Sequence, residues 1–80
     1  MKAKIYITLK QGVLDPQGKA IAGSLEHLGF RGINEVRQGK LIEIDLEETN
    51  LVKAQKSIEK MCEELLANTV IENYRFEIED

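Results

Sequence analysis

The sequence predicts a single α+β domain over residues 1–80, with its elements in the order β-α-β-β-α-β. Segments near both ends of the chain, and another in its middle, alternate apolar and polar residues as half-buried strands do. Two intervening segments repeat apolar residues at spacings of three and four, which is typical of amphipathic helices. A chain of 80 residues can bury one modest core, so a second domain is excluded.

The first two elements are a strand at residues 2–10 and a helix at about residues 16–28. The inward side of the strand consists of Ala3, Ile5, Ile7 and Leu9. Asp15 supplies a side-chain acceptor for the N-terminus of the helix, and Pro16 suits the first helical position. Gly29 predicts a left-handed cap that ends the helix. The apolar stripe of the helix, which we expect to face the core, consists of Gly18, Ile21, Ala22, Leu25 and Leu28.

Two further strands are predicted in the middle of the chain. The first of them is short, covers residues 32–37 and contains Ile33 and Val36. Gln38-Gly39 then occupies the position of a two-residue hairpin turn, which would need a positive φ. The next strand, at residues 41–47, alternates clearly between apolar and acidic residues.

A second helix and a last strand complete the chain. Thr49 or Asn50 can cap the helix, and Asn68 can take a left-handed conformation at its end. The last strand is predicted at residues 70–79, where aromatic and aliphatic residues alternate with charged ones. The apolar residues of the helix are Leu51, Ala54, Ile58, Met61, Cys62 and Leu65.

Two interleaved right-handed β-α-β units predict a ferredoxin-like arrangement, a four-stranded antiparallel sheet in the order 4-1-3-2 with both helices on one face. Lysines mark the open side of the strand at residues 2–10, whereas acids mark that of the strand at residues 41–47. Opposite charges on neighbouring strands stabilise the pairing. We therefore expect these two strands to be adjacent and antiparallel, with Lys4 close to Glu43 and Asp45.

Composition excludes several classes of function. The net charge is −3, with 14 acidic and 11 basic side chains, so a nucleic-acid surface is not expected. The open sheet face has Tyr6 but no aromatic residue on the strand at 41–47, which disfavours base stacking. The chain shows neither a signal peptide nor a membrane span, and we expect a cytoplasmic protein.

No catalytic, cofactor-binding or metal-binding site is predicted in this chain. Cys62 is the single cysteine and lies on an apolar helical stripe, so we expect it to be buried and structural. His27 lies on the side of its helix opposite the stripe, where a solvated histidine is the expected interpretation. The six glycines do not match a phosphate-binding loop.

Three segments of the sequence closely resemble the PurS family: KQGVLDPQG at residues 10–18, VRQGK at 36–40 and MCEELLAN at 61–68. The resemblance extends over the whole chain. PurS is the small subunit of phosphoribosylformylglycinamidine (FGAM) synthase, in purine biosynthesis. The resemblance implies a non-catalytic adapter that bridges a glutaminase, PurQ, and a synthetase, PurL, and assists ammonia transfer. It also implies that ATP and Mg²⁺ are used by the synthetase, and that the adapter forms a homodimer or a larger homo-oligomer.

The partner contacts are expected in the loops that the resemblance marks. Val13 and Leu14 are apolar residues in a turn, so one can lie under the helix end while the other meets a partner; burial of both is the alternative. A regulatory module of similar topology remains the second hypothesis, with an anion bound near Gly12 and Gly18. The predicted interface residues are Gly12, Val13, Leu14, Asp15, Pro16, Gln17, Gly18, Arg37, Gly39, Lys40 and Asn68.

Overall fold

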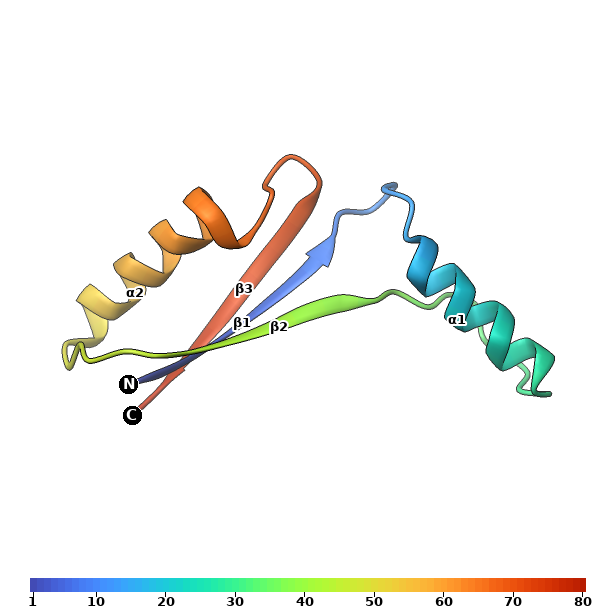
Figure 1. The fold of residues 1–80 in the computed structure, drawn as a ribbon, viewed down its shortest axis with the longest axis horizontal. Helices are drawn as coiled ribbons and strands as arrows, with labels where there is room; N and C mark the ends of the chain where they lie inside the picture. Colours follow the sequence, from blue (N-terminus) through green and yellow to red (C-terminus); the bar gives the residue numbers. More distant parts are fainter.

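The sheet of the protein has three strands. In the computed structural model, which describes residues 1–80, β1 (Lys2–Leu9) lies between β2 (Gly39–Asp45) and β3 (Glu72–Glu79). Both neighbours run antiparallel to β1 (Figure 1). The two chain termini lie together at one end of this sheet, and the chain leaves for its first helix at the other end.

One helix builds the core against the sheet. The α2 helix (Leu51–Met61) covers one face, and it continues into a single π-helical turn, η1 (Cys62–Leu66). The apolar residues of β1 alternate and so lie on one face of the sheet, and those of α2 recur every three or four residues and so lie on one face of the helix. These two faces pack against each other. The buried cluster consists of Ala3, Ile5, Ile7, Ile58, Cys62 and Ala67.

The charge pattern places the strands in the predicted register. Lys4 lies opposite Glu43 on β2 and opposite Glu77 on β3, and Lys2 lies opposite Asp45. The predicted antiparallel pairing of the first strand with the strand that begins near residue 41 is confirmed. Cross-strand pairs of opposite charge each contribute about 0.2–1 kcal/mol.

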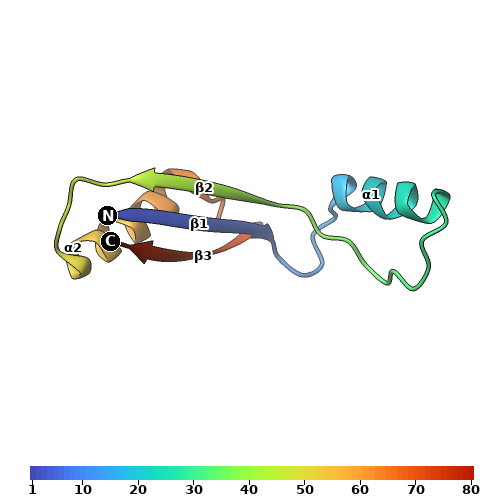
Figure 2. The same ribbon diagram turned by 90° about the horizontal axis from the view of Figure 1, so that it is seen from below.

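The predicted strand at residues 32–37 and the four-stranded order 4-1-3-2 are wrong. The sheet order is β2-β1-β3, and residues 30–38 form no regular element. They run back beside the first helix, beyond the end of the sheet, where no strand is available to pair with them (Figure 2). The backbone N–H of Gln38 instead donates to the Asp15 carboxylate, at 2.7 Å.

The hairpin turn predicted at Gln38-Gly39 is also absent. Gly39 begins β2, and positive φ values occur only at Gly12, Gly29 and Gly32. A Cβ atom at position 39 would lie 2.6 Å from the carbonyl oxygen of Ile7. Glycine is therefore needed here because two strands approach closely, not because the chain turns.

The first helix, α1 (Pro16–His27), has the predicted limits. The Asp15 side chain accepts a hydrogen bond from the Gly18 N–H at 2.8 Å, which confirms the N-cap. Gly29 has φ 97°, and the N–H of Phe30 donates to the Leu25 carbonyl at 3.1 Å. This is a Schellman motif, so the helix ends as predicted.

The position of α1 differs from the prediction, because the helix does not pack on the sheet. It projects from the sheet end as an arm, which we define as residues 10–38; the rest of the chain is the sheet body (Figures 1 and 2). The molecule measures 49 × 26 × 15 Å and has a Cα radius of gyration of 16.1 Å. A compact chain of this length would have about 12 Å. The stripe expected to face the core is consequently exposed at Ile21 and Leu28.

The end of the second helix also departs from a regular α-helix. Asn50 caps its start, accepting from the Lys53 N–H at 3.1 Å. At its end the Ala67 N–H donates to the Cys62 carbonyl, five residues back, and this wider turn shifts the helical spacing. Leu66 therefore packs against the core while Leu65, predicted to be inward, is exposed.

Candidate partner interface

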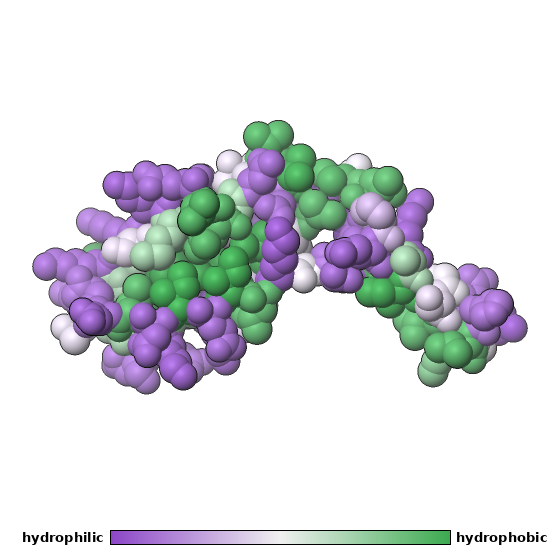
Figure 3. All heavy atoms as spheres, viewed as in Figure 1, coloured by the Kyte–Doolittle hydropathy of each residue, from purple (hydrophilic) through white to green (hydrophobic).

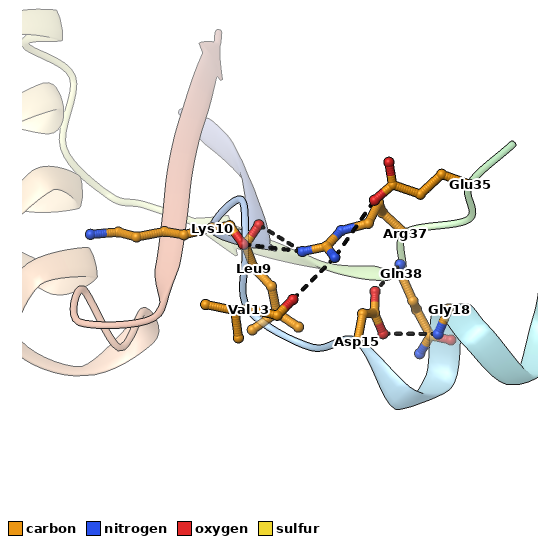
Figure 4. Close-up of polar contacts among 8 residues, drawn as sticks. All are labelled: Leu9, Lys10, Val13, Asp15, Gly18, Glu35, Arg37 and Gln38. Atoms are coloured by element: carbon orange, nitrogen blue, oxygen red, sulfur yellow. Dashed lines mark hydrogen bonds and ion pairs between the residues drawn. The ribbon is translucent and has the colours of Figure 1, made fainter.

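Most of the predicted interface residues meet where the arm joins the sheet body. We call this region the junction; it consists of residues 9–18, which leave the sheet, and residues 34–40, which return to it. The two segments cross at the start of α1 (Figure 4). A side chain of each segment forms hydrogen bonds with the backbone of the other segment.

Arg37, on the returning segment, binds the outgoing one. Its guanidinium donates to the carbonyls of Val13 at 3.1 Å, Leu9 at 3.3 Å and Lys10 at 3.2 Å. Glu35 lies 3.8 Å from the same guanidinium. The planar fork of arginine suits several acceptors at once. The donors of Arg37 are thus directed inward, at this chain's own backbone.

Asp15, on the outgoing segment, binds the returning one. Its side chain is only 5% exposed. Oδ1 accepts from the Gly18 N–H at 2.8 Å and Oδ2 from the Gln38 N–H at 2.7 Å. These hydrogen bonds, that of Gln38 first, lower the pKa of Asp15 below its ordinary value, and the charge of Arg37 acts in the same direction.

Gly18 allows the two segments to touch. A Cβ atom there would lie 2.3 Å from the Val36 carbonyl oxygen, so only glycine permits this approach. Beside it, the side chain of Gln38 donates to that of Gln17 at 2.7 Å. Pro16, an exposed residue, starts the helix. Gly12, with φ 84°, forms the exposed turn before it.

Asn68 belongs to another loop, but it is tied to the junction through Glu72. The Asn68 N–H donates to Glu72 Oε1 at 2.6 Å, and Lys40 Nζ lies 3.6 Å from Glu72 Oε2. The Lys10 N–H also donates to the Ile71 carbonyl at 2.8 Å. All the predicted residues therefore lie in one connected region. The predicted left-handed conformation of Asn68 is absent, because no non-glycine residue has a positive φ.

The two apolar residues of the outgoing loop have different environments. Val13 is half-buried, whereas Leu14 is 62% exposed. This agrees with the expectation that one is covered and the other is free to meet a partner. A groove of about 420 Å³ runs beside them between the two segments. The role of these residues in a partner contact stays a prediction.

The structure also exposes apolar residues of the arm, two of which, Leu28 and Ile33, were expected on a core-facing stripe and in a strand. On the arm, Leu28 is 73% exposed, Phe30 57% and Ile33 40%. Figure 3 shows hydrophobic residues along the arm, with a hollow between it and the sheet body. The helical spacing of Leu28 indicated burial, yet most of its surface is exposed in this chain.

The two residues considered for catalysis lie in different parts of the molecule. Cys62 is completely buried in the core, as expected, and desolvation, aided by Glu63 and Glu59, raises the pKa of its thiol. His27 is exposed on the arm. No three His, Cys, Asp or Glu side chains are grouped closely enough to hold a metal ion. None of the helices has the length and apolar character needed to cross a membrane.

The anion site of the alternative hypothesis is not favoured. An anion at the start of α1 would use the Gly18 N–H, and that group already donates to Asp15. A second carboxylate or phosphate would also meet the negative charge of Asp15. On the open sheet face, Arg75 covers the ring of Tyr6, 4.0 Å from its centroid, so this ring is not free to stack on a base.

A small α+β body with a projecting arm whose apolar residues are exposed is typical of the class of chains that bind other proteins. Comparison with known proteins identifies the particular family. Residues 2–80 match the family model PurS, phosphoribosylformylglycinamidine (FGAM) synthase. The chain belongs to the PurS family.

Relatives and solved structures agree with this assignment. The chain is 51% identical to the phosphoribosylformylglycinamidine synthase subunit PurS of Synechocystis, over 94% of this chain and 75% of the relative. It resembles the Methanocaldococcus jannaschii PurS structure with a TM-score of 0.88 and 44% identity, over 99% and 95% of the two chains. It also resembles a chain of the PurLQS structure from Thermotoga maritima, with a TM-score of 0.86 and 34% identity over 95% and 93%.

Proposed function

We propose that this chain is the non-catalytic adapter of a phosphoribosylformylglycinamidine synthase, joining a glutaminase, PurQ, to a synthetase, PurL. Membership of the PurS family places it among subunits of that enzyme. The bridging role is supported by the likeness of 95% of this chain to a chain of the Thermotoga PurLQS structure. The buried thiol and the surface histidine give this chain no pair of groups suited to catalysis.

The division of labour follows from the chemistry of the complex. Glutamine- and ATP-dependent conversion of FGAR to FGAM needs ammonia to pass from the glutaminase to the synthetase. Ammonia that escapes into water is diluted and protonated, so a subunit that holds the two enzymes in register increases the yield of transfer. ATP and Mg²⁺ belong to the synthetase, and the complex operates in the cytoplasm.

We further propose that the adapter is a homo-oligomer. An interface of standard size buries about 800 Å² on each partner. Contacts of this size with two large partners and a second copy would together take roughly two-fifths of the 6138 Å² that the chain exposes. The exposed apolar residues of the arm support contact with a second copy.

Reconstitution with PurQ and PurL from the same organism tests the adapter role. We expect this chain to increase glutamine-dependent FGAM formation strongly, while the ammonia-dependent reaction of PurL changes little. Ammonia-dependent activity serves as the internal control, because it needs no transfer between subunits. Unchanged glutamine-dependent activity, together with no ternary complex on size-exclusion chromatography, would contradict the proposal.

The junction contact has a separate test. Replacing the exposed Leu14 by Ser removes an apolar contact without altering the core, and it should weaken assembly with PurQ and PurL. Val52→Ser is the matched control, because Val52 is 58% exposed on α2, in the sheet body. Equal binding by both variants in a pull-down with the purified partners would remove Leu14 from the interface.

A further inference from the structure

The arm is attached to the sheet body without a shared hydrophobic core. Every residue of the buried cluster, and every half-buried apolar residue packed against it, belongs to the sheet body. Two backbone connections, at Lys10 and Gln38, join the two parts. Within one chain, apolar packing against the core does not fix the direction of the arm, so this direction depends on the polar contacts of the junction.

The two carboxylate oxygens of Asp15 serve different segments. Oδ1 holds the first turn of α1 through Gly18, and Oδ2 holds the returning segment through Gln38, at 2.8 and 2.7 Å. An N-cap needs only one of these acceptors, which serine or asparagine would also provide. The second acceptor has no function in capping. It ties the start of the helix to Gln38, the residue immediately before β2.

Arg37 makes the reciprocal connection. It lies next to Gln38 on the returning segment, and its guanidinium reaches three carbonyls of the outgoing segment, at 3.1–3.3 Å (Figure 4). A lysine would keep the charge but has one nitrogen, which cannot serve all three acceptors in this geometry. The close approach of Gly18 to the Val36 carbonyl oxygen adds a third contact between the outgoing and returning segments.

We propose that Asp15 and Arg37 form a reciprocal clamp that fixes the direction of the arm relative to the sheet. They are positioning residues: they set where the apolar residues of the arm are presented and need not touch a partner themselves. This assignment goes beyond the adapter function, and it concerns this chain alone.

Distance measurements by pulsed electron spin resonance test the clamp. Spin labels at Glu26→Cys on α1 and Glu79→Cys on β3 report the position of the arm, and the buried native Cys62 stays unlabelled. Labelled protein is diluted with unlabelled protein so that only distances within one chain are seen. We expect one narrow distance peak for the parent protein.

Asp15→Asn is the decisive variant. Asparagine keeps an oxygen for Gly18 but presents an N–H₂ group to the Gln38 N–H, so the cap is retained and the crossing is lost. We expect loss of the single narrow peak while circular dichroism shows unchanged helix content. Glu35→Gln is the matched control, because it removes the same charge beside Arg37 and leaves the clamp hydrogen bonds in place; it should keep the narrow peak.

Arg37→Lys provides a second, independent variant should Asp15→Asn reduce the helix content. It retains the charge and should also broaden the distribution. Narrow, parent-like peaks in both variants would overturn the proposal, as would equal broadening by Glu35→Gln, which would make charge and not hydrogen-bond geometry responsible. Because PurQ and PurL are absent from the measurement, its result does not depend on whether the adapter function is correct.

Discussion

At the scale of single residues, the hydrogen bonds of Asp15 at the base of the arm are expected to weaken at acid pH. Its folded-state pKa lies below the ordinary value of 3.8, so the stabilisation is present above that value and is lost as the pH falls through the folded-state pKa. In a nuclear magnetic resonance titration, the Gly18 and Gln38 amides should shift together below about pH 4. A midpoint above 3.8 for the Asp15 carboxylate would contradict the assignment.

Cys62 is expected to be an inert thiol. It is fully buried among Ile5, Ile58 and other core residues, and its pKa is raised. A thiol reagent should therefore react only as the protein unfolds, in parallel with loss of the circular dichroism signal. Cys62→Ala should cost about 1–2 kcal/mol of unfolding free energy and leave complex activity intact. Fast labelling of the folded protein would show that the helix end opens locally.

Residues whose role is local could be predicted from the sequence, and residues whose role depends on distant contacts could not. Asp15, Gly29 and Asn50 cap helices through groups within a few positions of themselves, and all three are confirmed. Gly39 was assigned to a turn, yet it is required by the distant Ile7 carbonyl. Asn68 was assigned a left-handed cap, yet its position depends on Glu72 in the next strand.

At the scale of elements, the two helices are expected to contribute very differently to stability. Ile58 on α2 is fully buried, so Ile58→Ala should lower the free energy of unfolding by about 2–5 kcal/mol. Ile33, in the segment beside α1, is 40% exposed and outside the core, so Ile33→Ala should cost less than about 1 kcal/mol in a monomeric background. Urea unfolding followed by far-ultraviolet circular dichroism compares the two. Equal losses would mean that the arm and the sheet body share a core.

The elements themselves were predictable where their periodicity is strong. Alternation identified the strands that form the sheet, and charge pairing gave the register of Lys4 against Glu43. The segment at 32–37 lacks this periodicity, because its two apolar residues, Ile33 and Val36, are spaced by three and not by two, and it forms no strand. The stripe of α1 indicated an apolar face correctly. Periodicity indicates which residues form an apolar face, but it does not indicate what that face packs against.

At the scale of the whole molecule, the elongated shape explains why topology was only partly predictable. Interleaved β-α-β units normally return each helix to the sheet. Here the crossing of residues 9–18 and 34–40 directs the first helix away, through long-range hydrogen bonds of Asp15 and Arg37. The sequence of a single chain contains no signal that distinguishes a stripe covered by its own sheet from one that this sheet leaves exposed.

The exposed arm leads to a prediction about association. Leu28 and Phe30, 73% and 57% exposed, are costly to leave in water, so the purified chain should self-associate through them. Leu28→Lys/Phe30→Lys should give a monomer, and lysine at the C-terminus of α1 keeps the helix stable. Leu65→Lys is the control, since it places a lysine at an exposed leucine near a helix end in the sheet body.

Sedimentation equilibrium and small-angle X-ray scattering decide the outcome. The parent protein and Leu65→Lys should show a concentration-dependent mass above 9.1 kDa. The double variant should remain at that mass, with a radius of gyration close to the 16.1 Å of the extended chain, because no contact within the chain folds the arm back. A monomeric parent protein, or a double variant with the parent's mass, would show that the apolar residues of the arm do not join two copies. A smaller radius of about 12 Å would show that the arm closes on its own sheet.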